Sequence, residues 1–153
     1  MLKLSKKVDY GLILLSKLTN EPASASAREM AQRYKLPQPM VANILKQLTS
    51  AGILVSTRGA QGGYELARDA SQISLADVVG ALEGPIGLVD CVSEGDACRF
   101  LAFCPTHDPI QAVHRKFQEF MEAYTIDEII GPPRQGSTFR FRMGNDEDSY
   151  LHG

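Results

Sequence analysis

The chain has 153 residues, of which 44% are hydrophobic and 22% are charged, and its formal net charge is −2. These values are ordinary for a small globular protein and exclude a fibrous or low-complexity chain. The longest apolar run, Leu12 to Leu15, is too short to span a membrane, and the first seven residues lack the apolar core of a secretory signal. We therefore predict a cytoplasmic protein of one or two small domains that does not enter a membrane.

Charge is divided unevenly along the sequence. Residues 1–68 contain ten lysines and arginines against four acidic residues, whereas residues 69–153 contain six against fourteen. A basic half of this kind is typical of a surface that faces a polyanion. A second interpretation is that the two halves carry opposite charge without binding any ligand.

The first 50 residues predict three helices. Apolar residues at helical spacing indicate a first helix from about Ser5 to Lys17, which ends before Pro22. Ser26 followed by Glu29 is the signature of a capping box, so a second helix is expected from there to about Tyr34. These two elements come just before a short turn, residues 35–38.

The third helix is expected to begin near Pro39, because proline is favoured in the first turn of a helix, and to end at Ala51-Gly52. Its buried side is predicted to carry the apolar residues Met40, Val41, Ile44, Leu45 and Leu48. Two short helices joined by a four-residue turn form the outline of a helix-turn-helix.

Two β-rich segments follow, residues 53–57 and 64–67, and they flank a basic, glycine-rich tip at residues 58–63. This pattern predicts a β-hairpin, and a hairpin directly after a recognition helix is the wing of a winged helix. The fold class predicted is mainly α, with a small hairpin wing and a long C-terminal helix.

A double-stranded DNA operator is the polyanion that this outline favours. Gln38 and Asn43 have side chains that can pair with adenine, Lys46 suits a phosphate, and Arg58 beside glycines suits a narrow minor groove. The alternative for Gln38 and Asn43 is that they are only solvated helix residues. The full set of predicted DNA contacts is Ser26, Arg28, Gln38, Pro39, Asn43, Lys46, Arg58, Gly59 and Gln61.

The second half is predicted to contain a helix from Ser74 to about Leu82 and a long helix that begins at Pro109. The long helix carries an apolar seam with the spacing of a coiled coil, formed by Ile110, Val113, Phe117, Phe120 and Tyr124. Such a seam packs either on its own core or on a twin, and we favour a homodimer. The predicted divisions are a DNA-binding domain at 1–85, a cysteine loop and dimerisation helix at 86–130, and a disordered tail at 131–153.

All three cysteines lie close together, at Cys91, Cys98 and Cys104, and His107 follows them. An odd number of cysteines argues against a set of disulfides, and thiolates with histidine suit an iron–sulfur cluster or zinc. Two other interpretations are inert buried thiols and an enzyme with a cysteine nucleophile and a histidine base. No third residue that would orient such a base can be identified, so the enzyme is disfavoured.

The sequence resembles the bacterial winged-helix repressors typified by the iron–sulfur cluster regulator IscR, and most closely their SUF-operon branch. The residues that carry the resemblance are Leu4-Ser5-Lys6, Asp9-Tyr10-Gly11, Arg58 to Arg68, Ala81 to Ile86 and the three cysteines, in that order. The resemblance implies a homodimer with long helices crossed between subunits. It also implies a [2Fe–2S] or [4Fe–4S] cluster on Cys91, Cys98 and Cys104, with regulation of cluster assembly or of iron and redox genes.

The resemblance offers two candidates for a fourth ligand. His107 matches the histidine of the cluster-biogenesis regulators, and Asp9 matches the first-helix aspartate that nitric-oxide-sensing relatives supply from the other subunit. In two places the chain departs from the family pattern. Cys91 and Cys98 are one residue further apart, and Ala42 replaces a base-discriminating glutamate, which predicts a different operator. A repressor with a structural zinc site remains the main alternative.

Overall fold

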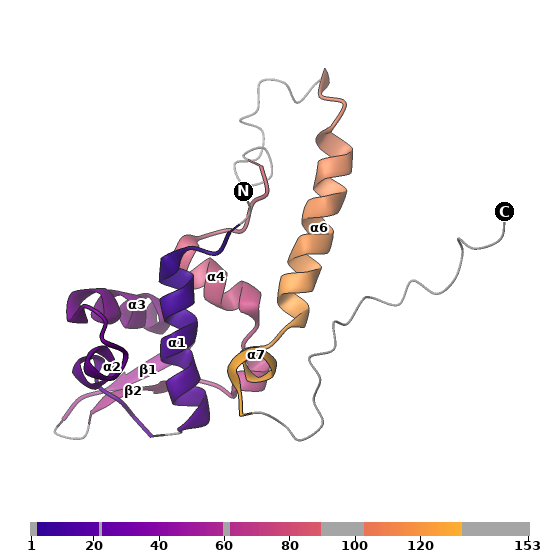
Figure 1. Ribbon diagram of the computed structural model, residues 1–153. Helices are drawn as coiled ribbons and strands as arrows, with labels where there is room; N and C mark the ends of the chain where they lie inside the picture. Colours follow the sequence, from indigo (N-terminus) through magenta and orange to yellow (C-terminus); the bar gives the residue numbers. More distant parts are fainter. Residues whose placement is uncertain (1–2, 22, 60–61, 90–102, 133–153) are drawn as a thin grey trace.

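The computed structural model describes residues 3–21, 23–59, 62–89 and 103–132. Helix α1 (Lys6–Asn20) crosses the N-terminal part of the molecule and packs against α3 (Gln38–Ser50), α4 (Leu75–Glu83) and strand β2 (Gly63–Leu66) of the hairpin (Figure 1). Ser5 begins α1 by accepting a hydrogen bond from the N–H of Val8. The predicted first helix is confirmed, and it extends three residues beyond Lys17.

Helices α2 (Ala27–Tyr34) and α3 (Gln38–Ser50) form the predicted helix-turn-helix. The capping box is present, because Ser26 accepts from the N–H of Glu29 while the Glu29 carboxylate accepts from the N–H of Ser26. Lys35 ends α2 in the left-handed conformation, with φ of 54°. That conformation reverses the chain within one turn and brings α3 against α2.

The predicted buried side of α3 is correct at four positions and wrong at one. Val41, Ile44, Leu45 and Leu48 are essentially inaccessible to solvent, whereas Met40 is 39% exposed. Position 40 lies about 100° around the helix from position 41, in the first turn of α3, so its side chain is at the edge of the buried face and remains partly exposed.

The predicted wing is a two-stranded antiparallel sheet of β1 (Leu54–Thr57) and β2 (Gly63–Leu66). Its register pairs Leu54 with Leu66 and Thr57 with Gly63. Tyr64 extends the sheet by exchanging two backbone hydrogen bonds with Ala25, of 2.9 and 3.1 Å. The hairpin is therefore fixed to the start of α2, which sets its position beside the helix-turn-helix.

Helix α4 (Leu75–Glu83) follows a 3-10 turn, η1 (Ala70–Gln72), and begins at a second capping box, formed by Ser74 and Asp77. Its apolar face lies against α1 and α3, with Val78, Val79 and Leu82 buried and Leu75 half-buried. The mainly helical fold with a hairpin wing is confirmed.

Helix α6 (His107–Ala123) projects from the rest of the molecule, and α7 (Ile126–Ile130) closes the described chain (Figure 1). The start of α6 is two residues earlier than predicted, so Pro109 lies inside its first turn, where a missing N–H costs no hydrogen bond. Backbone bonds of 2.8 Å from Leu75 to Tyr124 and from Ile126 to Ile73 attach the end of α6 to the start of α4.

The predicted apolar seam of α6 is divided between two faces. Tyr124 is buried and Ile110 and Phe117 are half-buried, whereas Val113 is 55% exposed and Phe120 is 38% exposed. The face turned toward the chain's own core is instead centred on His114 and Met121, both buried. The seam therefore does not lie wholly on one interface.

Among the described residues, no helix is both long enough and apolar enough to cross a membrane. The predicted boundaries at 85 and 130 stay predictions, and the proposed tail lies almost entirely outside the described residues.

Candidate functional site

The outward face of α3 carries the polar side chains that the sequence assigned to DNA. Gln38, Pro39, Asn43 and Lys46 are all exposed, while the opposite face of the helix is buried. The fold therefore separates the two roles of α3. One face holds the core together and the other is available to a partner.

The N-terminus of α3 is electrostatically suited to phosphate. Pro37 precedes the helix and no side chain caps it, so the first backbone N–H groups are not used by a capping side chain. The first turn also contains no acidic residue. Although Pro39 has no N–H, the other uncapped N–H groups of the first turn and the positive end of the helix dipole favour an anion at this position.

Two amide side chains on α3 are joined to each other. Gln47 Nε2 donates a 3.3 Å hydrogen bond to Asn43 Oδ1, across one turn of the helix. The bond leaves the Asn43 amino group as a donor and the Gln47 carbonyl as an acceptor. Gln47 was not among the predicted residues, although its position four residues after Asn43 gives the signal that could have identified it.

The cations of the basic half fall into two groups. Lys17 and Arg33 pair with Glu21, at 3.5 Å for Lys17, and Arg68 pairs with Asp77 at 3.1 Å. By contrast, the exposed cations predicted to contact DNA form no ion pair within the described parts of the chain; these are Arg28, Lys46 and Arg58. Their charge is not neutralised locally, as a phosphate-binding surface requires.

The wing tip depends on its glycines. Gly59 has φ of 123°, a conformation that side chains rarely adopt, and it is exposed beside Arg58. A Cβ on Gly62 would lie 2.4 Å from the carbonyl oxygen of Thr57, so the turn closes only with glycine there. Gln61 lies outside the described residues. Ser26 uses its hydroxyl in the capping box, and exposed Arg28 lies in the first turn of α2.

The described part of the cysteine region contains Cys104 and His107, while Cys91 and Cys98 lie outside the described residues. The Sγ of Cys104 is 3.3 Å from the hydroxyl of Thr106. Hydrogen bonding from the Thr106 side chain and backbone lowers the pKa of the Cys104 thiol below its ordinary value. A thiolate is the form in which cysteine binds a metal, so this environment suits a ligand.

His107 is the first residue of α6, and its N–H reaches the carbonyl of Cys104 at 3.4 Å. Its Nδ1 lies 2.8 Å from Asp108 Oδ1, and this contact engages one ring nitrogen and leaves Nε2 for another partner. A histidine whose second nitrogen contacts a carboxylate is a common arrangement in metal ligands. Cys104 and His107 together therefore fit a metal or cluster chemically.

Asp9 is exposed on α1. Within the ranges that the structure describes, no three histidine, cysteine, aspartate or glutamate side chains gather closely enough to hold a metal. The predicted ligands Cys104, His107 and Asp9 are thus not brought together within one described chain.

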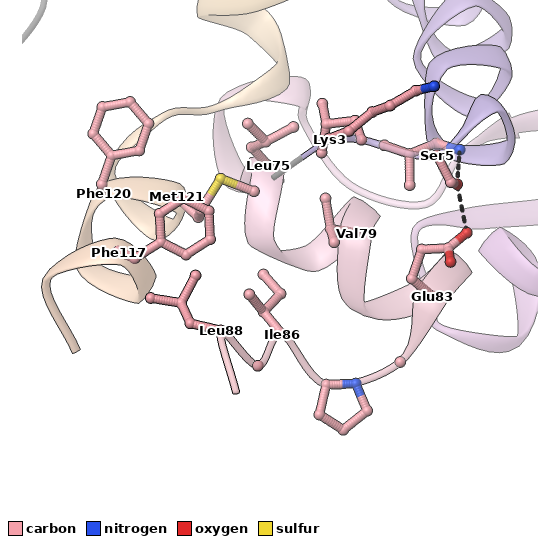
Figure 2. Close-up of a pocket in the computed structure, with 15 residues that line it drawn as sticks. Lys3, Ser5, Leu75, Val79, Glu83, Ile86, Leu88, Phe117, Phe120 and Met121 are labelled. Carbon is pink, nitrogen blue, oxygen red and sulfur yellow. Dashed lines mark hydrogen bonds between the residues drawn. The ribbon is translucent and has the colours of Figure 1, made fainter. Parts of the chain in front are cut away.

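An apolar groove of about 570 Å³ lies where α1, α4 and α6 meet, and no sequence pattern indicated it. Figure 2 shows Phe117, Phe120 and Met121 of α6 on one side of it and Val79 of α4 on the other. At its edge Ser5 Oγ donates a 2.6 Å hydrogen bond to Glu83 Oε1, the same oxygen that lies 3.8 Å from Lys7 Nζ. The start of α1 is thereby joined to the end of α4.

His114 is a second feature that the sequence patterns did not indicate. It is buried on α6, and its Nδ1 has no hydrogen-bond partner in the described structure.

Known proteins resemble this chain in both sequence and fold. The model of the Rrf2 family, described as iron-dependent transcriptional regulators, matches residues 4–132. The HTH-type transcriptional regulator NsrR of Oceanobacillus iheyensis is 27% identical over 132 residues, which cover 84% of this chain and 90% of that protein.

Two solved structures extend the comparison. CymR, the global cysteine regulator of B. subtilis, matches with a TM-score of 0.66 and 26% identity, over 85% of this chain and 97% of that one. IscR of T. potens matches with a TM-score of 0.61 and 27% identity, over 84% and 86%. The relatives are transcriptional regulators and not enzymes, as the sequence predicted. The chain therefore belongs to the Rrf2 family and is a DNA-binding transcriptional regulator.

Proposed function

We propose that this regulator binds its operator as a homodimer, through α3 and the wing, and that an iron–sulfur cluster on the cysteine region controls its affinity. The observation that carries the sensing role is the position of Cys104, whose thiol pKa Thr106 lowers, in the turn that leads into α6, where a backbone bond joins it to His107. Relatives named NsrR and IscR belong to the same family, and we extend cluster binding from that family to this chain.

The proposed ligands are Cys91, Cys98 and Cys104 with His107 as the fourth. The contact between His107 Nδ1 and Asp108 supports His107, because it fixes the ring and leaves Nε2 available. Asp9 of the partner subunit is the alternative fourth ligand, since its exposed position on α1 leaves it accessible to a second chain. Zinc on the same residues is the alternative to a cluster.

The position of the cysteine region supports a link to DNA binding. It connects the end of α4 to the start of α6, and both helices are attached to the DNA-binding part of the molecule. Glu83 at the end of α4 holds the start of α1, while Tyr124 at the end of α6 bonds to Leu75. A cluster supplies a centre that reacts with oxidants and can be lost. A change in the cysteine region would therefore be transmitted to the DNA-binding part of the molecule through these attachments.

A homodimer is supported by the exposed side of α6. Val113 and Phe120 lie on one side of the helix and leave apolar surface open to solvent. A second copy related by twofold symmetry would cover this surface and would place two α3 helices on the half-sites of a palindromic operator. We further propose a cytoplasmic location and targets in iron–sulfur cluster assembly or in iron and redox metabolism.

Anaerobic purification tests the proposal. The product should be coloured, contain acid-labile sulfide and have the mass of a dimer plus cluster in native mass spectrometry. Its affinity for an operator, selected from random duplexes, should change when the cluster is removed by a chelator and oxidant. A colourless protein that contains zinc and binds the same operator with or without metal would replace sensing with a structural role.

Variants then separate the candidate ligands. Cys104→Ala should abolish the visible absorption, and His107→Ala should weaken or shift it, whereas Asp9→Ala should leave it unchanged. If Asp9→Ala shifts the spectrum and His107→Ala does not, the partner subunit supplies the fourth ligand. Asp127→Ala removes a carboxylate on α7, outside the candidate ligands, and controls for loss of a carboxylate alone.

A further inference from the structure

Met40 has a position that the core of the protein does not explain. It is 39% exposed, although the other large apolar residues of α3 are at most 1% exposed. A single exposed apolar side chain is common on protein surfaces and alone indicates nothing. The inference comes from where Met40 lies.

Met40 lies on the outward side of α3, within its first turn. Asn43 is three residues further on and Gln47 is seven, so all three lie along one side of the helix. Asn43 and Gln47 hold each other through their 3.3 Å hydrogen bond, which fixes a polar pair. Met40 thus places an apolar surface on the same side of the recognition helix as the Asn43–Gln47 pair, one turn before the free amino group of Asn43.

The major groove presents a matching combination. An A·T pair shows, in a row, the N7 acceptor and N6 donor of adenine, the O4 acceptor of thymine and the thymine 5-methyl group. The methyl group is the apolar feature of that edge. A flexible thioether side chain adapts well to such a contact, because methionine is unbranched and polarisable.

We propose that Met40 is a specificity-determining residue that packs against a thymine 5-methyl group in each half-site of the operator. Asn43 would contact an adenine edge beside it. The inference rests on the proposed use of α3 as the reading helix, and it deepens that proposal by naming the base feature that is recognised.

The test uses duplexes that the wild-type protein selects from a random pool, with single thymines replaced by deoxyuridine, which lacks only the methyl group. Removal of the critical methyl should weaken binding by about fourfold, the value expected for one buried methyl-sized group. The Met40→Ala variant should bind thymine and deoxyuridine equally at that position. The Met40→Leu variant, which keeps an apolar side chain, should retain the preference.

Leu4→Ala is the matched control, because Leu4 is a similarly exposed apolar residue, at 47%, that precedes α1 and lies outside α3 and the wing. This variant should keep the full deoxyuridine penalty. Met40→Ala should unfold at the same urea concentration as the wild type, since the side chain leaves no cavity in the core. The inference is overturned if every deoxyuridine penalty is the same in Met40→Ala and wild type, or if the selected sites contain no thymine. A wild type that selects no sequence refutes the proposed function itself.

Discussion

Gly11 of α1 lies so close to Leu82 of α4 that a Cβ added to the glycine would be 2.5 Å from Leu82 Cδ1. Leu82 is only 3% exposed, so its side chain has little room to move away. The contact sets the distance between the two helices that flank α3. It also explains why a glycine is present in a helix, where it lowers stability relative to alanine.

Gly11→Ala should therefore destabilise the protein by about 1–3 kcal/mol, because overpacking outweighs the gain in helix propensity. Gly80→Ala is the matched control on α4, where an added Cβ meets no atom within 4 Å. That variant should stabilise the protein by about 0.5–1 kcal/mol. Urea unfolding of both proteins measures the difference, and a stabilised Gly11→Ala would mean that α1 and α4 are not in close contact.

Lys46 should contribute to DNA affinity through charge. Lys46→Ala should weaken binding to all duplexes alike and reduce the slope of log affinity against log salt by about one for each phosphate contact removed. Lys116→Ala is the control, because Lys116 lies on α6 and pairs with Glu119 at 3.2 Å. Fluorescence anisotropy over a range of salt concentrations provides the measurement. An unchanged slope in Lys46→Ala would place the phosphate contacts elsewhere.

Val113→Asp should dissociate the proposed dimer, because it places a charge in the apolar surface that the second copy would cover. Ala112→Asp introduces the same charge on an exposed position of the same helix and should leave the dimer intact. Analytical ultracentrifugation distinguishes monomer from dimer. Circular dichroism should show both variants folded, since neither position is buried in the chain. If the Val113→Asp variant remains dimeric at micromolar concentration, the interface does not include this side of α6.

Local signals made most of the fold predictable. Serine or threonine followed three residues later by an acidic residue begins α2, α4 and α7, and each of these starts is a capping box in the structure. The wing followed from the glycine-rich tip between two β-rich segments. Such signals lie within a few residues of each other, so the sequence alone carries them.

The incorrect predictions concern which side of a helix faces the core of the protein. Met40 fits the apolar pattern of α3 by residue type, but the direction of the core is set by α1 and α4, which are distant in sequence. The same reason explains α6, where His114 rather than Val113 is buried. The groove at α1, α4 and α6 could not be predicted, because it depends on three elements separated by many residues.

Helix α3 starts without a capping side chain, and its outward residues add nothing to the core on its other side. Substitutions along that outward edge should therefore cost little thermodynamic stability, so a lineage could change the sequence it recognises while keeping the scaffold intact. Divergence of target genes among proteins with this architecture would then require only a few replacements in one short stretch of chain.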